Sequence, residues 1–311
     1  MRIFVTGVAG QLGSDTVKEL VQRGHKPIPS DVRAPEYDPP TPEPLTGENP
    51  DPFFVPLDIT DEKQVKDVIK RLHPDAIIHC AAWTNVDGAE DESKKSLVHA
   101  INADGTRYIA EAAKSIDAKM IYISTDYVFN GQGTEPWQPD DKSFAPLNYY
   151  GQTKLEGEQA VSNILDKFFI VRIAWVFGLN GKNFIKTMIN VGKTHDTVRV
   201  VDDQIGTPTY TKDLARLLVD MVETEKYGYY HATNEGGYIS WADLAEESYR
   251  AAGMDVKVNR VSTAEYGLSI AARPFNSRLD KSKLIAAGFE LLPDWKDAVR
   301  RYIEEAELKN G

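Results

Sequence analysis

The stretch MRIFVTGVAGQLGSDTVKEL, residues 1–20, decides the fold. An apolar run is followed by Gly7, Gly10 and Gly13, spaced three apart, and then by residues of helical period. Because glycine lacks a side chain, such a loop can turn tightly and bring its backbone close to a diphosphate. The unpaired amides and the dipole of the following helix favour that negative charge. The stretch therefore predicts a strand, a loop and a helix that bind a dinucleotide, with a plain strand-to-helix turn as the alternative.

Acidic residues follow the next two apolar runs. Asp31 ends the second run, where a carboxylate can accept hydrogen bonds from the adenosine ribose and favour NAD(H). Arg33 lies two residues later and can meet a 2′-phosphate, so the choice between NADH and NADPH stays open. Asp58 and Ile59 end the third run, where they can frame the adenine, although Asp58 can equally cap the helix that begins near Asp61.

Beyond residue 20, apolar runs alternate with segments of helical period. The runs that predict strands are FFVPLDI, AIIHCAA, KMIYIST and FFIVRIAWVFG, and the helical segments include residues 93–116 and 150–164. This alternation is typical of a parallel sheet covered by helices on both faces. We predict an α/β fold, with a doubly wound, Rossmann-type parallel sheet and a smaller C-terminal α/β substrate domain. Residues 1–175, with about 195–225, are assigned to the dinucleotide-binding domain and 176–311 mainly to the substrate-binding domain.

Prolines mark the least regular part of the pattern. The second run, KPIPSD, places Pro27 and Pro29 where a central strand tolerates them poorly. Ten of the 17 prolines fall between Pro27 and Pro56. Residues 34–52 are therefore predicted to form a surface excursion, with a tolerated insertion that has no role as the simplest interpretation.

Composition narrows the class of protein. The 311 residues carry 47 acidic and 36 basic side chains without a basic stripe, which disfavours nucleic-acid binding. A single cysteine, Cys80, cannot form an intrachain disulfide, and no apolar run has the roughly 18 residues of a membrane span. We expect a soluble cytoplasmic protein that binds no membrane. None of the six histidines is spaced with cysteines or carboxylates as in a zinc site, so we assign no metal.

Two clusters carry the chemistry. Tyr150 and Lys154 lie four apart on a predicted helix, so the ammonium can lie beside the phenol and lower its pKa. A tyrosine and a lysine at this spacing are common by chance, and the alternative is an amphipathic helix with a solvated lysine. Ser124, Thr125 and Asp126 end the fifth apolar run, at the sheet edge where ligands bind. A hydroxyl there can stabilise a carbonyl oxygen as negative charge develops.

Several blocks in order resemble one family. TGVAGQLG, LDITD, HCAAWTNVDGAE, NADGTRYIAEAA, STDYVFNG, PLNYYGQTKLEGE, VRIAWVFG, NFIKTM, DDQIGTPTY and RPFNSRLD resemble the extended short-chain dehydrogenase/reductase superfamily and, within it, the dTDP-4-dehydrorhamnose reductases. The resemblance runs through nearly the whole chain, apart from the proline-rich excursion, which puts the geometry around Asp31 in doubt. It implies a catalytic triad of Thr125, Tyr150 and Lys154.

The resemblance also implies the two sets of binding residues. Contacts to NADPH or NADH are expected from Gly7, Gly10, Gln11, Leu12, Gly13, Asp31, Asp58, Ile59, Ala81, Ala82, Trp83, Thr84, Tyr150 and Lys154. Contacts to the sugar nucleotide are expected from Val86, Thr125, Asp126, Tyr127, Trp175, Asn183 and Arg273. An aromatic ring such as Trp175, at the carboxyl end of a sheet, is placed to lie over a base or a sugar.

The implied reaction is the NAD(P)H-dependent reduction of the C4 ketone of dTDP-4-dehydro-6-deoxy-L-mannose to dTDP-L-rhamnose. This is the last step in making that donor of cell-envelope polysaccharide sugar. Related 4,6-dehydratases carry an Asp-Glu pair where this chain has Asp126-Tyr127, so the missing carboxyl favours reduction. Another nucleotide-sugar 4-ketoreductase or epimerase, and a non-catalytic regulator like the methionine adenosyltransferase β-subunit, stay open. We expect a dTDP-sugar as partner and a monomer or homodimer.

Overall fold

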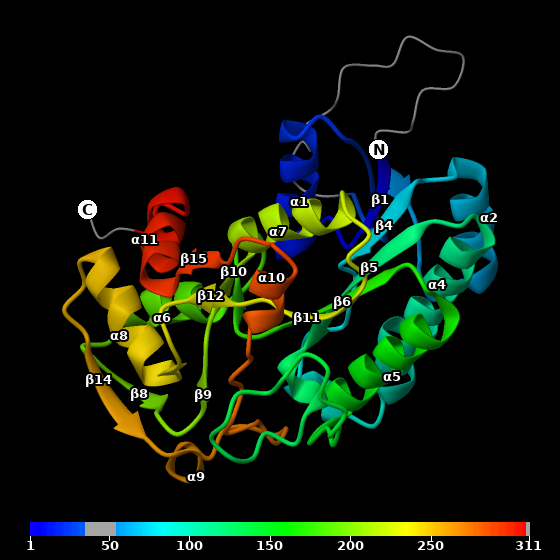
Figure 1. Cartoon of the computed structure of the whole chain (residues 1–311). Helices are drawn as coiled ribbons and strands as arrows, with labels where there is room; N and C mark the ends of the chain where they lie inside the picture. Colours follow the sequence, from blue (N-terminus) through cyan, green and yellow to red (C-terminus); the bar gives the residue numbers. More distant parts are fainter. Residues whose placement is uncertain (35–53, 309–311) are drawn as a thin grey trace.

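The computed structural model describes residues 1–34 and 54–308. Its centre is a parallel sheet of seven strands in the order β11-β6-β5-β4-β1-β2-β3 (Figure 1). These strands are β1 (Arg2–Thr6), β2 (Lys26–Asp31), β3 (Val55–Pro56), β4 (Ala76–His79), β5 (Lys119–Thr125), β6 (Phe168–Ile173) and β11 (Gly228–His231). Almost all of the predicted excursion, residues 34–52, lies outside the described residues.

Helices cover both faces of this sheet. One face packs against α1 (Gln11–Gln22), α7 (Thr211–Val222) and the short α10 (Ser282–Ala286), which bury a shared apolar core. The other face packs against α2 (Glu62–Leu72), α4 (Thr106–Ser115) and α5 (Tyr149–Ile164). Strands whose two faces are both buried need continuous apolar sequence, as these have. The predicted doubly wound α/β fold is confirmed.

The prolines of β2 are tolerated because of the side that their nitrogens face. Lys26 donates its amide to the Met1 carbonyl and Val8 donates to the Ser30 carbonyl, so alternate residues of β2 bond toward β1. Pro27 and Pro29 lie between these positions and face the other side. There, β3 pairs only with the end of β2, from Ser30 onward. The missing amides therefore cost the ladder no hydrogen bond.

The predicted helix over 93–116 is divided into three parts. The segments are α3 (Lys95–His99), a π-helical turn η2 (Ala100–Gly105) and α4. Within the turn, the Asn102 carbonyl accepts a hydrogen bond from the Thr106 hydroxyl at 2.7 Å. π-Helical turns of this kind occur often beside functional sites.

A smaller α/β region holds a second apolar core beside the sheet. Its elements are α6 (Phe184–Gly192), β8 (Thr197–Val201), α8 (Trp241–Ala252), β14 (Lys257–Val261), α9 (Thr263–Tyr266) and α11 (Trp295–Glu305). Strands β8 and β14 pair in parallel. The stretch 195–225 is thus divided, since β8 lies in this region whereas α7 covers the large sheet.

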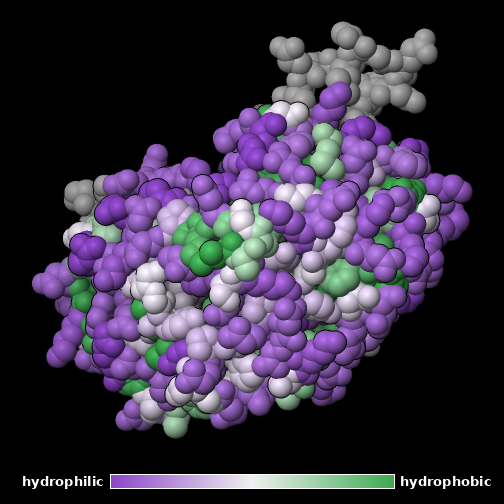
Figure 2. Space-filling view, in the orientation of Figure 1, coloured by the Kyte–Doolittle hydropathy of each residue, from purple (hydrophilic) through white to green (hydrophobic). Residues whose placement is uncertain are grey.

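The remaining elements are short. They are η1 (Asp87–Glu90), η3 (Asp126–Val128), β7 (Val176–Phe177), β9 (Ile205–Gly206), β10 (Thr209–Tyr210), β12 (Asn234–Glu235), β13 (Ile239–Ser240) and β15 (Leu292–Asp294). The face shown in Figure 2 is mostly hydrophilic, with small, separated apolar areas. Within the described residues, no helix is long and apolar enough to cross a membrane.

Candidate active site

A cleft of about 940 Å³ opens at the carboxyl ends of β1, β2, β4, β5 and β6. One wall is the glycine loop and the strand ends of the large sheet. The other wall comes from the smaller region and includes Phe184, Trp241 and Leu244. Ligands of open α/β sheets bind at this edge, because helix N-termini and loop amides converge there. The cleft is therefore the candidate site.

The glycine loop allows its own backbone to approach a ligand closely at the start of α1. Gly7 has φ +73°, and a Cβ on it would lie 2.6 Å from the Ala81 amide nitrogen. A Cβ on Gly13 would collide with the Gly7 carbonyl. Gly10 begins α1 without a side-chain cap, and the first turn carries no acidic residue. The amides at this helix end, with Gln11 and Leu12 also lining the cleft, fit an anionic diphosphate.

Asp31 lies in the cleft and is held by backbone amides. Its carboxylate accepts hydrogen bonds from the amides of Ala9, at 3.1 Å, and Val32, at 2.8 Å. Arg33 also lines the cleft, so both residues that bear on the choice of dinucleotide face the same space. The Ala9 contact ties the carboxylate to the glycine loop, which fixes its position.

Asp58 and Ile59 line the same end of the cleft. Asp58 accepts hydrogen bonds from the amide of Thr60, at 2.9 Å, and from its hydroxyl, at 2.7 Å. The helix cap is instead Asp61, whose carboxylate accepts the Gln64 amide at 2.9 Å. The alternative, in which Asp58 caps this helix, is therefore wrong: the cap is Asp61.

The loop after β4 contributes all but one of its expected residues. Ala81, Ala82, Thr84 and Val86 line the cleft, and Trp83 does not. The Trp83 amide donates to the side-chain oxygen of Asn102 at 2.8 Å, and its indole donates to the Asn85 carbonyl at 2.9 Å. Trp83 thus anchors the loop to the π-helical turn η2.

Thr125, Tyr150 and Lys154 meet on one side of the cleft. Thr125 ends β5, and the two others lie one turn apart on α5, whose first turn is capped by Asn148 through the Gly151 amide at 2.8 Å. The ammonium of Lys154 donates to the Ile123 carbonyl at 2.8 Å and lies 4.1 Å from the centroid of the Tyr122 ring. Burial lowers the pKa of Lys154 to about 7, which the nearby charge of Glu158 partly opposes.

The phenol of Tyr150 does not have the lowered pKa expected from the sequence. Burial raises its pKa, and the charge of Asp126 raises it further. A hydrogen bond with Thr125 acts in the opposite direction. The Lys154 ammonium donates to the Ile123 carbonyl, and desolvation of the phenol sets the direction of its pKa shift.

Asp126 is a buried carboxyl group next to Thr125. It accepts hydrogen bonds from the Thr125 hydroxyl at 3.1 Å and from the Ser277 hydroxyl at 2.5 Å. Burial raises the pKa of Asp126 to about 6, against the effect of both hydroxyls. The ring of Tyr127 packs edge-on against that of Tyr150, with centroids 5.7 Å apart. Ser277 was missed as a site residue although it lies in the block RPFNSRLD, because no spacing links it to Asp126 about 150 residues away.

Trp175 lies just after β6 with φ +50°, a backbone conformation uncommon for a large side chain. Its ring lines the cleft and stacks on Trp241, the first residue of α8. Phe184 packs against Trp241 with ring centroids 4.7 Å apart. Trp241 and Phe184 were also missed. Each is an aromatic residue that begins a helix after a short loop, and this position is the sequence signal that could have identified them.

Two expected sugar-nucleotide contacts do not line the cleft. Asn183 is the cap of α6, accepting the Lys186 amide at 2.9 Å and donating to the Gln11 side chain at 3.2 Å. Arg273 forms a bidentate ion pair with Asp87, at 3.0 and 2.8 Å. In the structure, both residues therefore hold parts of the fold together around the cleft.

One buried hydroxyl in the cleft has its hydrogen-bonding capacity unused. Ser124 lines the cleft, its hydroxyl is buried, and it has no hydrogen-bond partner among the described residues. Leaving a buried polar group unpaired is costly, so such a group is expected where a ligand completes it. With the glycine loop, this orphaned group makes the cleft fit a bound dinucleotide and its reaction partner.

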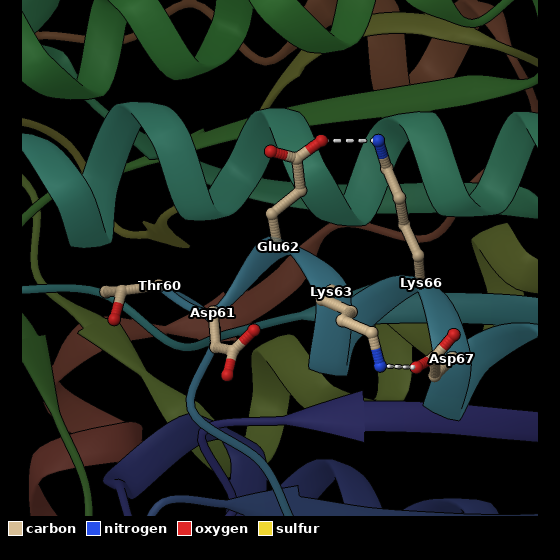
Figure 3. Close-up of a pocket in the computed structure, with 6 residues that line it drawn as sticks. All are labelled: Thr60, Asp61, Glu62, Lys63, Lys66 and Asp67. Atoms are coloured by element: carbon tan, nitrogen blue, oxygen red, sulfur yellow. Dashed lines mark hydrogen bonds and ion pairs between the residues drawn. The ribbon is translucent and has the colours of Figure 1, made fainter.

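A second hollow, of about 530 Å³, lies at the start of α2. Figure 3 shows the residues that line it: Thr60, Asp61, Glu62, Lys63, Lys66 and Asp67. Its lysines are paired with its acids, Lys66 with Glu62 at 2.5 Å and Lys63 with Asp67 at 3.0 Å. Apart from Thr60, which also borders the cleft, it shares no residue with it. No group of three or more His, Cys, Asp or Glu side chains in residues 1–34 and 54–308 could hold a metal ion.

Comparison with known proteins places the chain among sugar-nucleotide enzymes. The family described as RmlD substrate binding domain matches residues 1–308. A dTDP-4-dehydrorhamnose reductase from Streptomyces griseus is 42% identical over 249 residues, covering 78% of this chain and 81% of the relative. The spore coat polysaccharide biosynthesis protein SpsK from Bacillus subtilis is 34% identical over 304 residues, 98% of this chain and 97% of the relative.

The same likeness holds in three dimensions. A crystal structure of dTDP-4-dehydrorhamnose reductase from Bacillus anthracis, in complex with NADP, superposes with a TM-score of 0.85 at 38% identity. The match covers 98% of this chain and 99% of that one. The resemblance noted from the sequence blocks is confirmed at the level of the family.

Proposed function

The chain belongs to the RmlD substrate-binding-domain family, and from that premise we propose that it reduces the C4 ketone of dTDP-4-dehydro-6-deoxy-L-mannose to dTDP-L-rhamnose. NADPH or NADH is the proposed reductant. The observation that carries the proposal is the meeting of Thr125, Tyr150 and Lys154 in the cleft that also holds the glycine loop. A proton donor and a dinucleotide-binding loop in one cleft are what a ketone reductase requires.

The dinucleotide is proposed to bind along the carboxyl ends of β1, β2 and β4. The amides at the start of α1 take the diphosphate, and Asp31 or Arg33 meets the adenosine ribose. Lys154 is assigned to the ribose next to the nicotinamide, as the family resemblance implies. When bound, the reduced nicotinamide supplies a hydride.

Tyr150 is proposed to give its phenolic proton to the ketone oxygen. A high pKa suits this role, since the phenol stays protonated until an oxygen of still higher basicity develops beside it. Thr125 ends β5 in the same cleft as the phenol, and its side chain is proposed to help position the ketone there. Lys154, when protonated below its pKa of about 7, is proposed to supply positive charge beside the phenol.

The sugar nucleotide is proposed to lie between the sheet edge and the smaller region. Trp175, Trp241 and Tyr127 provide aromatic surface along that part of the cleft. The side chain at position 127 also bears on the reaction type. Tyr127 is a phenol whose pKa burial raises, so it stays neutral and cannot act as the second carboxylate of a dehydratase.

The proposal is tested with purified protein and a panel of nucleotide 4-keto sugars. The panel pairs dTDP-4-dehydro-6-deoxy-L-mannose with its D-gluco isomer and with a UDP counterpart, and follows the absorbance of NADPH and NADH. Consumption of the dinucleotide with the first compound, and dTDP-L-rhamnose as product by NMR, supports the proposal. Turnover of another member alone changes the substrate. Dinucleotide binding without any turnover indicates a regulator, and isomerisation without net consumption indicates an epimerase.

A further inference from the structure

We propose that Ser277 is a positioning residue of the active site, whose hydroxyl fixes the buried Asp126 carboxylate and thereby the direction of the Thr125 hydroxyl. This inference rests on the proposed function and concerns the same site. Ser277 touches neither Tyr150 nor the glycine loop in any contact described above, so it acts through its neighbours.

The backbone around Ser277 is held from both sides. Residues 275–280, here called the strap, run between the loop after η3 and strand β9. On one side, the Ser277 amide donates to the Ile205 carbonyl and the Ile205 amide donates to the Phe275 carbonyl, each at 2.8 Å. On the other, the Trp137 amide donates to the Arg278 carbonyl at 2.9 Å. A strap bonded along both edges has little freedom, so it presents the Ser277 side chain at a fixed place.

Hydrogen-bond donors around Asp126 can be counted. The Ser277 hydroxyl donates to one carboxylate oxygen at 2.5 Å, and the Thr125 hydroxyl donates to the other at 3.1 Å. An ionised carboxylate only accepts hydrogen bonds, so each hydroxyl donates its single proton to it. Thr125 is then left with lone pairs, one of which accepts the Tyr127 amide at 3.3 Å. The direction of the Thr125 hydroxyl is thereby set by the Asp126 carboxylate.

Burial makes this arrangement depend on Ser277. Asp126 and Ser277 are each 2% exposed. If the Ser277 hydroxyl were removed, one oxygen of this buried carboxylate would lose its donor. The carboxyl group would then take up a proton at higher pH or turn toward Thr125. Either change would alter the direction of the Thr125 hydroxyl, which the proposed triad requires at the carboxyl end of β5.

The strap also meets the aromatic wall of the cleft. A Cβ on Gly206 of β9 would lie 2.9 Å from the Ser277 Cβ and 3.1 Å from the Trp175 ring. Gly206 therefore lets the strap and Trp175 approach the same point. Ser277 thus joins three parts of the site: the strap of the smaller region, the substrate-facing tryptophan and the carboxyl end of β5.

The charged and titratable groups near Asp126 come from several elements. Tyr127 on η3 and Tyr150 on α5 stay neutral because burial raises the pKa of each phenol. Arg273 and Asp87 act on Tyr127 in opposite directions, and the strap carries Arg278 and Asp280. Lys154, whose pKa is about 7, lies in the same cleft, so the titration of Asp126 has to be followed at its own carboxyl carbon.

The test compares Ser277→Ala and Ser277→Thr with the wild type. The alanine variant is expected to lose roughly tenfold to a hundredfold in kcat, as for a lost hydrogen bond to a charged group. Its Kd for NADPH should be unchanged, and the acidic limb of its pH–rate profile should move to higher pH. The threonine variant keeps the hydroxyl and should restore most of the rate. Ser282→Ala is the matched control, since Ser282 donates to Asp280 at the exposed start of α10.

A second readout needs no substrate. NMR titration of the Asp126 carboxyl carbon should give a higher pKa in Ser277→Ala than in the wild type, where it lies at about 6. The same titration in both proteins overturns the inference, as does an alanine variant with wild-type kcat and pH profile. A wild type that reduces no member of the keto-sugar panel overturns the proposed function instead, so the two failures are distinct.

Discussion

Trp175 and Trp241 stack with their ring centroids 3.9 Å apart and their planes at 19°. Trp175 follows β6 of the large sheet, whereas Trp241 begins α8 of the smaller region, so the stack bridges the two walls of the cleft. A rigid aromatic surface of this kind suits a flat base or the apolar face of a sugar ring.

Trp241→Ala should weaken sugar-nucleotide binding, because it removes the ring on which Trp175 stacks. An aromatic pair contributes about 0.5–1.5 kcal/mol, so KM for the keto sugar should rise by roughly twofold to tenfold. The Kd for NADPH should not change. Trp241→Phe keeps a ring in place and serves as the control. Steady-state kinetics check this, and an unchanged KM in the alanine variant would show that the stack plays no part in binding.

Tyr150→Phe should abolish most turnover while leaving the dinucleotide bound. Loss of a general acid typically costs a factor of roughly a hundred to ten thousand in rate. The control is the neighbouring Tyr149→Phe, because Tyr149 packs near Lys95 and lies outside the cleft lining. The measurements are kcat and a fluorescence titration with NADPH. A Tyr150→Phe protein with full activity would remove the proposed proton donor.

Asp126→Asn should change how stability depends on pH. The folded protein raises the pKa of Asp126 from 3.8 to about 6, so the folded state binds the proton more tightly than the unfolded state. Stability from this group is full below the unfolded value and is lost as pH rises toward 6. Above that pH the burial of the charge costs roughly 3 kcal/mol.

Urea unfolding at several pH values measures this effect. Relative to the wild type, the asparagine variant should gain stability between about pH 4 and pH 6 and hold a constant difference above. A difference that stays flat across this range would mean that Asp126 titrates with its ordinary pKa.

Asp31→Ala should shift the choice of dinucleotide toward NADPH. A carboxylate repels a 2′-phosphate and accepts a hydrogen bond from a free ribose hydroxyl. Its loss should therefore change the ratio of kcat/KM with NADPH to kcat/KM with NADH by roughly tenfold or more. Arg33→Ala is the opposite control, expected to shift the ratio toward NADH. Kinetics with both dinucleotides check the pair. Equal ratios before and after the Asp31 substitution would exclude a contact with the ribose.

Arg172 and Glu158 form a buried ion pair behind α5, with two hydrogen bonds of 2.8 Å and side chains 1% exposed. Glu158→Gln should destabilise the fold by about 3–5 kcal/mol, because it leaves a buried guanidinium without its charge partner. Replacing the pair together, as Glu158→Leu with Arg172→Met, should cost less. Denaturant unfolding compares them, and Asp67→Asn at the exposed Lys63 pair is the control. A double variant less stable than Glu158→Gln would contradict the argument.

The sequence predicted the large sheet well because its signals are local. Each buried strand is a continuous apolar run, and the glycine spacing marks one loop. The prolines of β2 appeared unfavourable for a central strand only because the sequence does not tell which side of a strand is paired. The break in the helix over 93–116 depends on contacts of Asn102 with Trp83 and Thr153, which no periodicity reveals.

The candidate site shows the same division. Residues in spaced motifs, such as Tyr150 and Lys154, line the cleft as expected. Trp241 reaches it only through the fold of the smaller region and carries no motif, whereas Ser277 stands in the block RPFNSRLD beside the cleft, where no spacing singles it out. Arg273 lay in a suggestive block, yet its guanidinium is taken by Asp87, an ion pair across 186 positions of chain.

The return of the chain to the large sheet bears on how the protein can be divided. After β6 it builds part of the smaller region, then comes back as α7 and the edge strand β11. A fragment ending near residue 175 would lack both elements, exposing the apolar side of α1 and an open ladder on β6. A cut near residue 175 would therefore separate the nucleotide-binding segment from an edge strand and a covering helix of its own sheet, and the two fragments would have to stay associated to keep that sheet complete.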